Sequence, residues 1–185
     1  MRVRIPPLAL FHRQPTQEVV TIIATDIGYN EEQGTALAAA VAFAHWGDAV
    51  AAHEWTVHIE GIQPYEPGAF YKRELPCLMA LLDAAPCPVR TVIVDGHTWL
   101  GRGQPGLGKY LYDELRELVP VIGIAKRAFH QGCAFELLRG KSSNPLHVTV
   151  AGMHEVTLQG YLHQLHGPHR IPTLLKRVDA MSRGR

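Results

Sequence analysis

Two apolar segments that each carry an aspartate constrain the fold of this chain more than any other feature. The segment "VVTIIATDIGYN" at 19–30 holds Asp26 near its end, and "TVIVD" at 91–95 closes on Asp95. Both segments are rich in β-branched residues and predict buried strands. A lone carboxylate that loses its water costs several kcal/mol. Each aspartate is therefore expected either to cap a helix or close a turn, or to serve a functional site.

The remaining hydrophobic pattern predicts a mixed α/β fold. The runs at 35–46 and 49–59 flank the turn at Gly47 and Asp48, which together with the first strand predicts a three-stranded antiparallel meander. Helical spacing then predicts a helix over 70–85 with Pro76 inside it. Beyond strand 91–95 we expect a helix at 106–118, a strand at 119–126, a hairpin or two edge strands at 134–140 and 146–152, and helices at 154–165 and 172–183. This order predicts a meander followed by βαβ crossovers, with helices on both faces of the sheet.

Two further acids fall on predicted helices. Glu74 lies on the first helix, directly after the meander, and Asp179 lies on the last helix. Adjacent strand ends would bring Asp26 and Asp95 together, and like charges at short distance need a cation to stay ionised. Carboxylate oxygens suit Mg²⁺ or Mn²⁺, so we expect these four acids to be metal ligands. Their order along the chain resembles the layout of the ribonuclease H-like fold.

Composition sets the broad class. The chain has 185 residues, of which 46% are hydrophobic and 19% charged, so we expect one globular domain over 1–185. No apolar run is long enough to span a bilayer, and the first residues, with two prolines, do not resemble a signal peptide. Three cysteines in no metal pattern predict reduced thiols and a cytoplasmic location. The net charge of +1 neither requires nor excludes nucleic acid. The oligomeric state stays open.

Six short segments resemble motifs of the endonuclease V family, a group of inosine-directed nucleases with the ribonuclease H-like fold. They follow one another in the family's order over almost the whole chain, from about Val20 to Arg183. The segments are "ATDIGY", "PYEPGAFYKRELP", "VIVDG", "PVIGIAK", "NPLHVTVAG" and "HRIPTLLKRVDAMSR".

The resemblance implies roles for individual residues. Asp26 and Asp95 would be the principal metal ligands, with Glu74 and Asp179 completing the catalytic site. Lys126 would lie near the scissile phosphate, and Tyr65 matches the wedge tyrosine that inserts into the duplex. The implied activity is Mg²⁺-dependent hydrolysis of DNA or RNA near a deaminated purine, leaving a 5′-phosphate and a 3′-hydroxyl.

The loop after Asp95 departs from the family pattern. The segment "GHTWLGRGQPGLG" carries Gly101 where the family has a histidine, and no H-P-R sequence follows. We expect this glycine-rich loop to form the wall of the base pocket, with substrate contacts from His97, Trp99, Gly106 and Gly108, because glycines let the backbone approach a base closely. The wedge tip also carries Glu66 where an apolar residue is common.

The same loop contains the spacing G-x-x-x-x-G-K of a phosphate-binding loop, formed by Gly103, Gly108 and Lys109. Tyr110 stands where such a loop needs Ser or Thr, and the glycines begin several residues after the strand ends. Three functions therefore remain. The intact acids favour a metal-dependent endonuclease, the altered loop leaves open a nucleic-acid-binding relative with altered or lost cleavage, and a nucleotide-binding loop is the weakest alternative.

Overall fold

A computed structural model describes residues 21–129 and 133–185 of the chain. The N-terminal segment, which we expect not to be a signal peptide, lies outside these residues. In the described part, no helix is long and apolar enough to cross a membrane. Cys77, Cys87 and Cys133 are free thiols.

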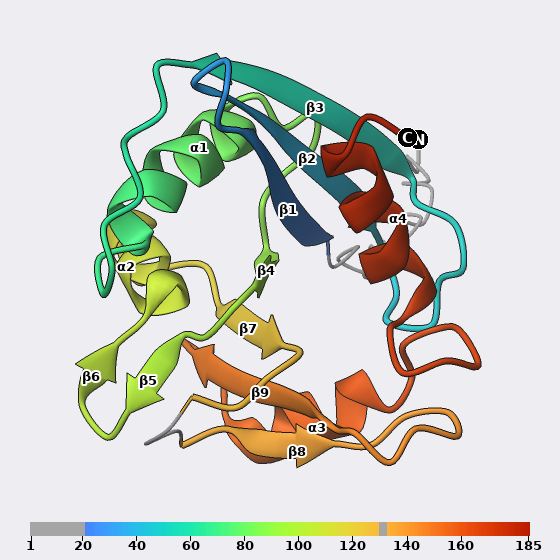
Figure 1. Cartoon of the computed structure of the whole chain (residues 1–185). Helices are drawn as coiled ribbons and strands as arrows, with labels where there is room; N and C mark the ends of the chain where they lie inside the picture. The colour runs from blue at the N-terminus through green and yellow to red at the C-terminus, as the bar shows by residue number, and fades with distance from the viewer. Residues whose placement is uncertain (1–20, 130–132) are drawn as a thin grey trace, which may run out of the picture.

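Seven strands of the described residues form one sheet (Figure 1). The predicted meander is confirmed as the antiparallel strands β1 (Ile22–Asn30), β2 (Thr35–Phe43) and β3 (His53–Glu60). β1 pairs in parallel with β4 (Thr91–Asp95), and β4 in parallel with β7 (Val121–Ala125). The sheet is completed by β9 (Leu146–Ala151) and β8 (Phe135–Leu137), giving the order β3-β2-β1-β4-β7-β9-β8.

The predicted helices cover both faces of this sheet (Figure 1). α1 (Tyr71–Asp83) and α2 (Leu107–Glu114) pack on one face, where Leu78, Leu81 and Leu111 meet alternate residues of the strands. α3 (Glu155–Leu162) and α4 (Thr173–Ser182) pack on the other face through Leu158, Leu162 and Val178, among other apolar residues. Because side chains alternate along a strand, Ile22 and Ala24 of β1 face α4 while Ile23 faces α1.

Several boundaries differ from those predicted. α2 ends earlier than expected because Arg116 and Glu117 adopt φ of 56° and 58°, a left-handed conformation that stops a helix. β8 and β9 form the expected antiparallel pair, but only β8 is an edge strand, since β9 also pairs with β7. The loop after Asp95 forms a small hairpin that the sequence did not predict, from β5 (Trp99–Gly101) and β6 (Gln104–Pro105).

Candidate active site

Asp26 and Asp95 lie on neighbouring parallel strands and on the same face of the sheet. Asp26 is the fifth of nine residues of β1, not near its end as predicted, but pairing of β1 with β4 stops at Ala24. Asp26 therefore lies just beyond the part of β1 that pairs with β4, and Asp95 is the last residue of β4. Both follow the alternation that directs Ala24 and Ile93 towards α4.

α4 packs closely enough on β1 to add a hydroxyl and a third aspartate. Ser182 donates its hydroxyl to a carboxylate oxygen of Asp26. Gly28 makes this approach possible, because a Cβ at this position would lie 2.1 Å from the main-chain oxygen of Ser182. Asp179, one helical turn before Ser182, lines the same groove as Asp26 and Asp95. The close packing of α4 on β1 thus joins residues that are 156 positions apart.

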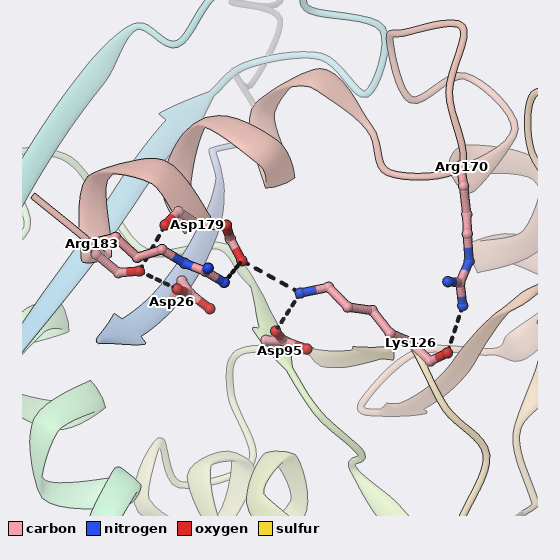
Figure 2. Close-up of polar contacts among 7 residues, drawn as sticks. Asp26, Asp95, Lys126, Arg170, Asp179 and Arg183 are labelled. Atoms are coloured by element: carbon pink, nitrogen blue, oxygen red, sulfur yellow. Dashed lines mark hydrogen bonds and ion pairs between the residues drawn. The ribbon is translucent and has the colours of Figure 1, made fainter. Parts of the chain in front are cut away.

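Lys126 follows β7 and joins two of the aspartates (Figure 2). Its Nζ lies 3.3 Å from a carboxylate oxygen of Asp95 and 3.4 Å from one of Asp179. Arg183 donates to the same Asp179 oxygen at 2.9 Å. Burial lowers the pKa of Lys126, but the two carboxylates outweigh this and leave that pKa above its usual range. Lys126 is therefore a stable cation at the centre of the group.

Burial and, after it, the neighbouring acids raise the pKa of Asp26. Burial is the largest cause; the Ser182 hydroxyl opposes it, and the charges of Asp95 and Asp179 raise the pKa further. Glu74 is affected more strongly. Its side chain is 8% exposed, and burial, followed by the charges of Asp95 and Asp26, raises its pKa to about 8.

Glu74 reaches this centre from the face of the sheet that α1 and α2 cover. It lies in the first turn of α1, and its Oε2 is buried without a hydrogen-bond partner. The adjacent Arg73 is 4% exposed and binds Glu31 at 2.7 Å while lying over the Tyr29 ring. Arg73 thereby ties the start of α1 to the turn after β1.

All four predicted metal-binding acids line one open groove of about 880 Å³, together with Lys126 and Ser182. Carboxylate oxygens are the donors that hard divalent cations prefer, and the Oε2 of Glu74 is buried without a partner. Burial, and after it the charges of the neighbouring acids, raises the pKa of both Asp26 and Glu74. As they stand, no three acidic, His or Cys side chains within 21–129 and 133–185 meet closely enough to hold one ion, and the Lys126 ammonium lies between two of the acids. The donor set therefore fits Mg²⁺ or Mn²⁺ in chemistry, with Lys126 as the present counter-charge.

A second cavity of about 440 Å³ adjoins the acids and shares Glu74 and Asp95 with the groove. Three of the predicted substrate-binding residues, Tyr65, His97 and Gly106, line it. The Tyr65 ring is 60% exposed. Four more aromatic residues line the cavity, and no sequence pattern indicated that they would. They are Phe70, Phe129 and the stacked rings of Tyr71 and Tyr110.

The other two predicted substrate-binding residues, Trp99 and Gly108, are not among the lining residues of this cavity. Trp99 is half-buried, and its indole N–H donates to the main-chain oxygen of Val150 at 3.0 Å. Gly108 is in α2, where a Cβ would lie 2.5 Å from the Thr98 hydroxyl. The Trp99 bond ties the β5–β6 hairpin to β9, and the missing side chain of Gly108 lets α2 pack against Thr98.

The structure argues against a nucleotide-binding loop at 103–109, because its lysine is already paired. Lys109, which would bind phosphate in such a loop, forms ion pairs with Asp113 and Glu117. The glycines of the motif span the β5–β6 hairpin and the start of α2, in place of a loop directly between strand and helix. Tyr110 stacks on Tyr71 with ring centroids 3.8 Å apart.

Comparison with known proteins agrees with this architecture. The family model described as Endonuclease V matches residues 9–162. The endonuclease V of Streptomyces avermitilis is 31% identical over 88% of this chain and 79% of its own length. Its crystal structure has a TM-score of 0.71 at 27% identity, covering 89% of this chain and 80% of that one.

A more distant relative shares the fold. The endonuclease V of Ciona intestinalis, solved in complex with a 23mer DNA containing an inosine followed by a ribo-adenosine, has a TM-score of 0.74 at 15% identity. The match covers 91% of this chain and 86% of that one. The predicted ribonuclease H-like mixed sheet with helices on both faces is thus confirmed.

Proposed function

Because the chain belongs to the endonuclease V family, we propose that it is a metal-dependent endonuclease that cuts DNA or RNA near a deaminated purine such as inosine. Membership of this family makes the chain a nuclease. The inosine-containing DNA bound by the Ciona intestinalis relative supports the choice of lesion. The observation that carries the rest is the meeting of acids from β1, β4, α1 and α4 in one groove beside a lysine.

The four acids Asp26, Glu74, Asp95 and Asp179 would hold Mg²⁺ or Mn²⁺. When bound, such a cation lowers the pKa of an attacking water and stabilises charge on the leaving oxygen. The unpartnered oxygen of Glu74 supports this assignment. Burial and then the neighbouring acids raise the pKa of Glu74 and Asp26, and a divalent charge would offset the repulsion between the acids.

Lys126 would neutralise charge on the scissile phosphate. Its Nζ carries a firmly bound proton and lies among the acids, so it can donate to a phosphate oxygen that approaches them. Water adds to phosphorus and the P–O3′ bond breaks, which leaves a 5′-phosphate on one fragment and a 3′-hydroxyl on the other.

The 440 Å³ cavity would receive the flipped base. Its lining of aromatic rings offers stacking surfaces, and it opens beside Glu74 and Asp95, so a base held there keeps its backbone near the acids. The exposed ring of Tyr65 would fill the gap that the base leaves in the duplex.

A cleavage assay on matched oligonucleotides, with and without one inosine and with Mg²⁺ present, tests this function when run beside a binding assay. We expect cleavage that depends on both Mg²⁺ and inosine. Tight binding of the inosine oligonucleotide without cleavage would instead support the alternative of a binding relative that has lost its activity.

A further inference from the structure

Arg170 lies in the segment before α4 and forms no hydrogen bond or ion pair with the four acids, yet it is joined to the active site through the main chain. Its Nη2 donates to the main-chain oxygen of Lys126 at 2.5 Å and to that of Pro145 at 2.7 Å. Figure 2 shows the guanidinium directed at the Lys126 carbonyl, on the side away from the aspartates. Arg170 thus joins the residue that follows β7 to the residue that precedes β9.

The position of these two carbonyls explains why such a tether matters. β7 and β9 are antiparallel neighbours, and their pairing ends with Ala125 opposite His147. Lys126 is therefore the first residue beyond the ladder, where strand hydrogen bonds no longer fix the backbone. A side chain as long as lysine amplifies any movement of its Cα, and its Nζ must reach both Asp95 and Asp179.

The segment that carries Arg170 is itself fixed. Arg139 donates to the main-chain oxygens of Gly167 and His169 at 3.2 Å and 3.1 Å, and also to that of Leu165. A Cβ at the neighbouring Gly140 would lie 2.5 Å from the main-chain oxygen of Pro168. The backbone on the N-terminal side of Arg170 is therefore held in place by side-chain bonds and close packing.

We propose that Arg170 is a positioning residue, which holds the backbone at Lys126 so that the ammonium lies among the acids. This inference rests on the proposed function for the role of Lys126 at the phosphate. Arg170 acts through Lys126 because, within the described residues, its guanidinium donates only to main-chain oxygens, those of Lys126 and Pro145. A guanidinium suits this task, because its planar nitrogens present hydrogens in fixed directions.

Amide hydrogen exchange tests the tether without reference to activity. Arg170→Ala should speed exchange at residues 126–128, and Arg170→Lys should have a smaller effect. The matched control is Arg177→Ala, which also removes a hydrogen-bonded guanidinium from the C-terminal segment, there bonded to Glu54 and to the main-chain oxygen of Arg185. The control should leave exchange at 126–128 unchanged. Unchanged exchange in a folded Arg170→Ala protein, or in Arg170→Met if the alanine variant does not fold, overturns the proposal, because neither side chain can donate to the two carbonyls.

A double-mutant cycle tests whether Arg170 acts through Lys126. Lys126→Ala should lower kcat about 100-fold or more, and Arg170→Ala about 10- to 100-fold with KM unchanged, as for a displaced catalytic group. The double variant should be within about threefold of Lys126→Ala, because Arg170 then has nothing left to position.

The possible results distinguish failure of the positioning role of Arg170 from failure of the proposed nuclease function. Losses that multiply in the double variant would mean a general structural role for Arg170 and overturn the proposal, as would full activity of Arg170→Ala. A wild-type protein that cleaves no substrate refutes the proposed function, and the exchange at 126–128 then decides alone whether Arg170 holds Lys126.

Discussion

Glu74 is buried beside two other acids, and its pKa is strongly raised. Burial and the charges of Asp95 and Asp26 raise its pKa from an ordinary 4.5 to about 8, and Arg73 opposes the shift only in part. The folded protein therefore holds a proton on Glu74 that the unfolded chain releases near pH 4.5. Between these two pH values the free energy of unfolding falls as the pH rises.

Glu74→Gln should remove this pH dependence. At about 1.4 kcal/mol per pKa unit, the variant should become more stable than the wild type by a few kcal/mol near pH 8.5, and the difference should vanish towards pH 4.5. Urea unfolding in EDTA from pH 4.5 to 8.5 measures it. Glu155→Gln, on the exposed surface of α3, is the control and should follow the wild type. Parallel curves for Glu74→Gln and the wild type would show that Glu74 is not perturbed.

At the scale of the element, the packing of α4 on β1 builds the site. Gly28→Ala would place a methyl group 2.1 Å from the main-chain oxygen of Ser182, so the end of α4 must move away. We expect a loss of about 1–3 kcal/mol of stability and lower activity, because Ser182 and Asp179 move with the helix.

The control for this variant is Gly160→Ala in α3, where a Cβ meets nothing within 4 Å. Alanine is the better helix former, so the control should keep full activity and gain up to about 1 kcal/mol. Unfolding curves and cleavage rates are the measurements. A Gly28→Ala protein as stable and active as the control would contradict the tight packing of α4.

The β5–β6 hairpin should limit selectivity for inosine. The amides of the two glycines expected to contact the base are already used, because Gly106 donates to the main-chain oxygen of Thr98 and Gly108 to that of His97. Aromatic rings dominate the cavity, and stacking tolerates any base. Each unsatisfied polar group is worth about 1–3 kcal/mol of discrimination, so we expect kcat/KM for inosine over guanosine in one sequence context to stay below about a hundredfold. A ratio of several hundred would refute this.

Sequence patterns predicted the elements better than their contacts. The apolar runs around Asp26 and Asp95 are long enough for periodicity to identify strands, and the acids follow from them. The three-residue strand at Trp99 is too short to show a period, and its indole bonds to Val150, 51 residues away. Ser182 and Arg170 were missed for the same reason, since their partners Asp26 and Lys126 are 156 and 44 residues away.

At the scale of the whole molecule, one sheet brings its functional residues to a single region. The pairing of the parallel strands β1 and β4 stops just before Asp26 and Asp95, α1 brings Glu74 from one face of the sheet, and α4 brings Asp179 from the other. The groove that holds the acids adjoins the aromatic cavity. A nucleic acid bound with its base in the cavity would therefore present its backbone to the acids.

Cleavage of an inosine-containing oligonucleotide by the wild type and by Asp95→Asn, each with Mg²⁺, tests this account most directly. The amide keeps the shape of the side chain but removes the charge that would hold the cation. We predict Mg²⁺-dependent cleavage by the wild type and a loss of at least ~10³-fold in the variant, since several kcal/mol of transition-state stabilisation depend on the cation, with an unchanged fold by circular dichroism. Equal activity of a folded Asp95→Asn protein would contradict the assignment of these acids as the catalytic centre.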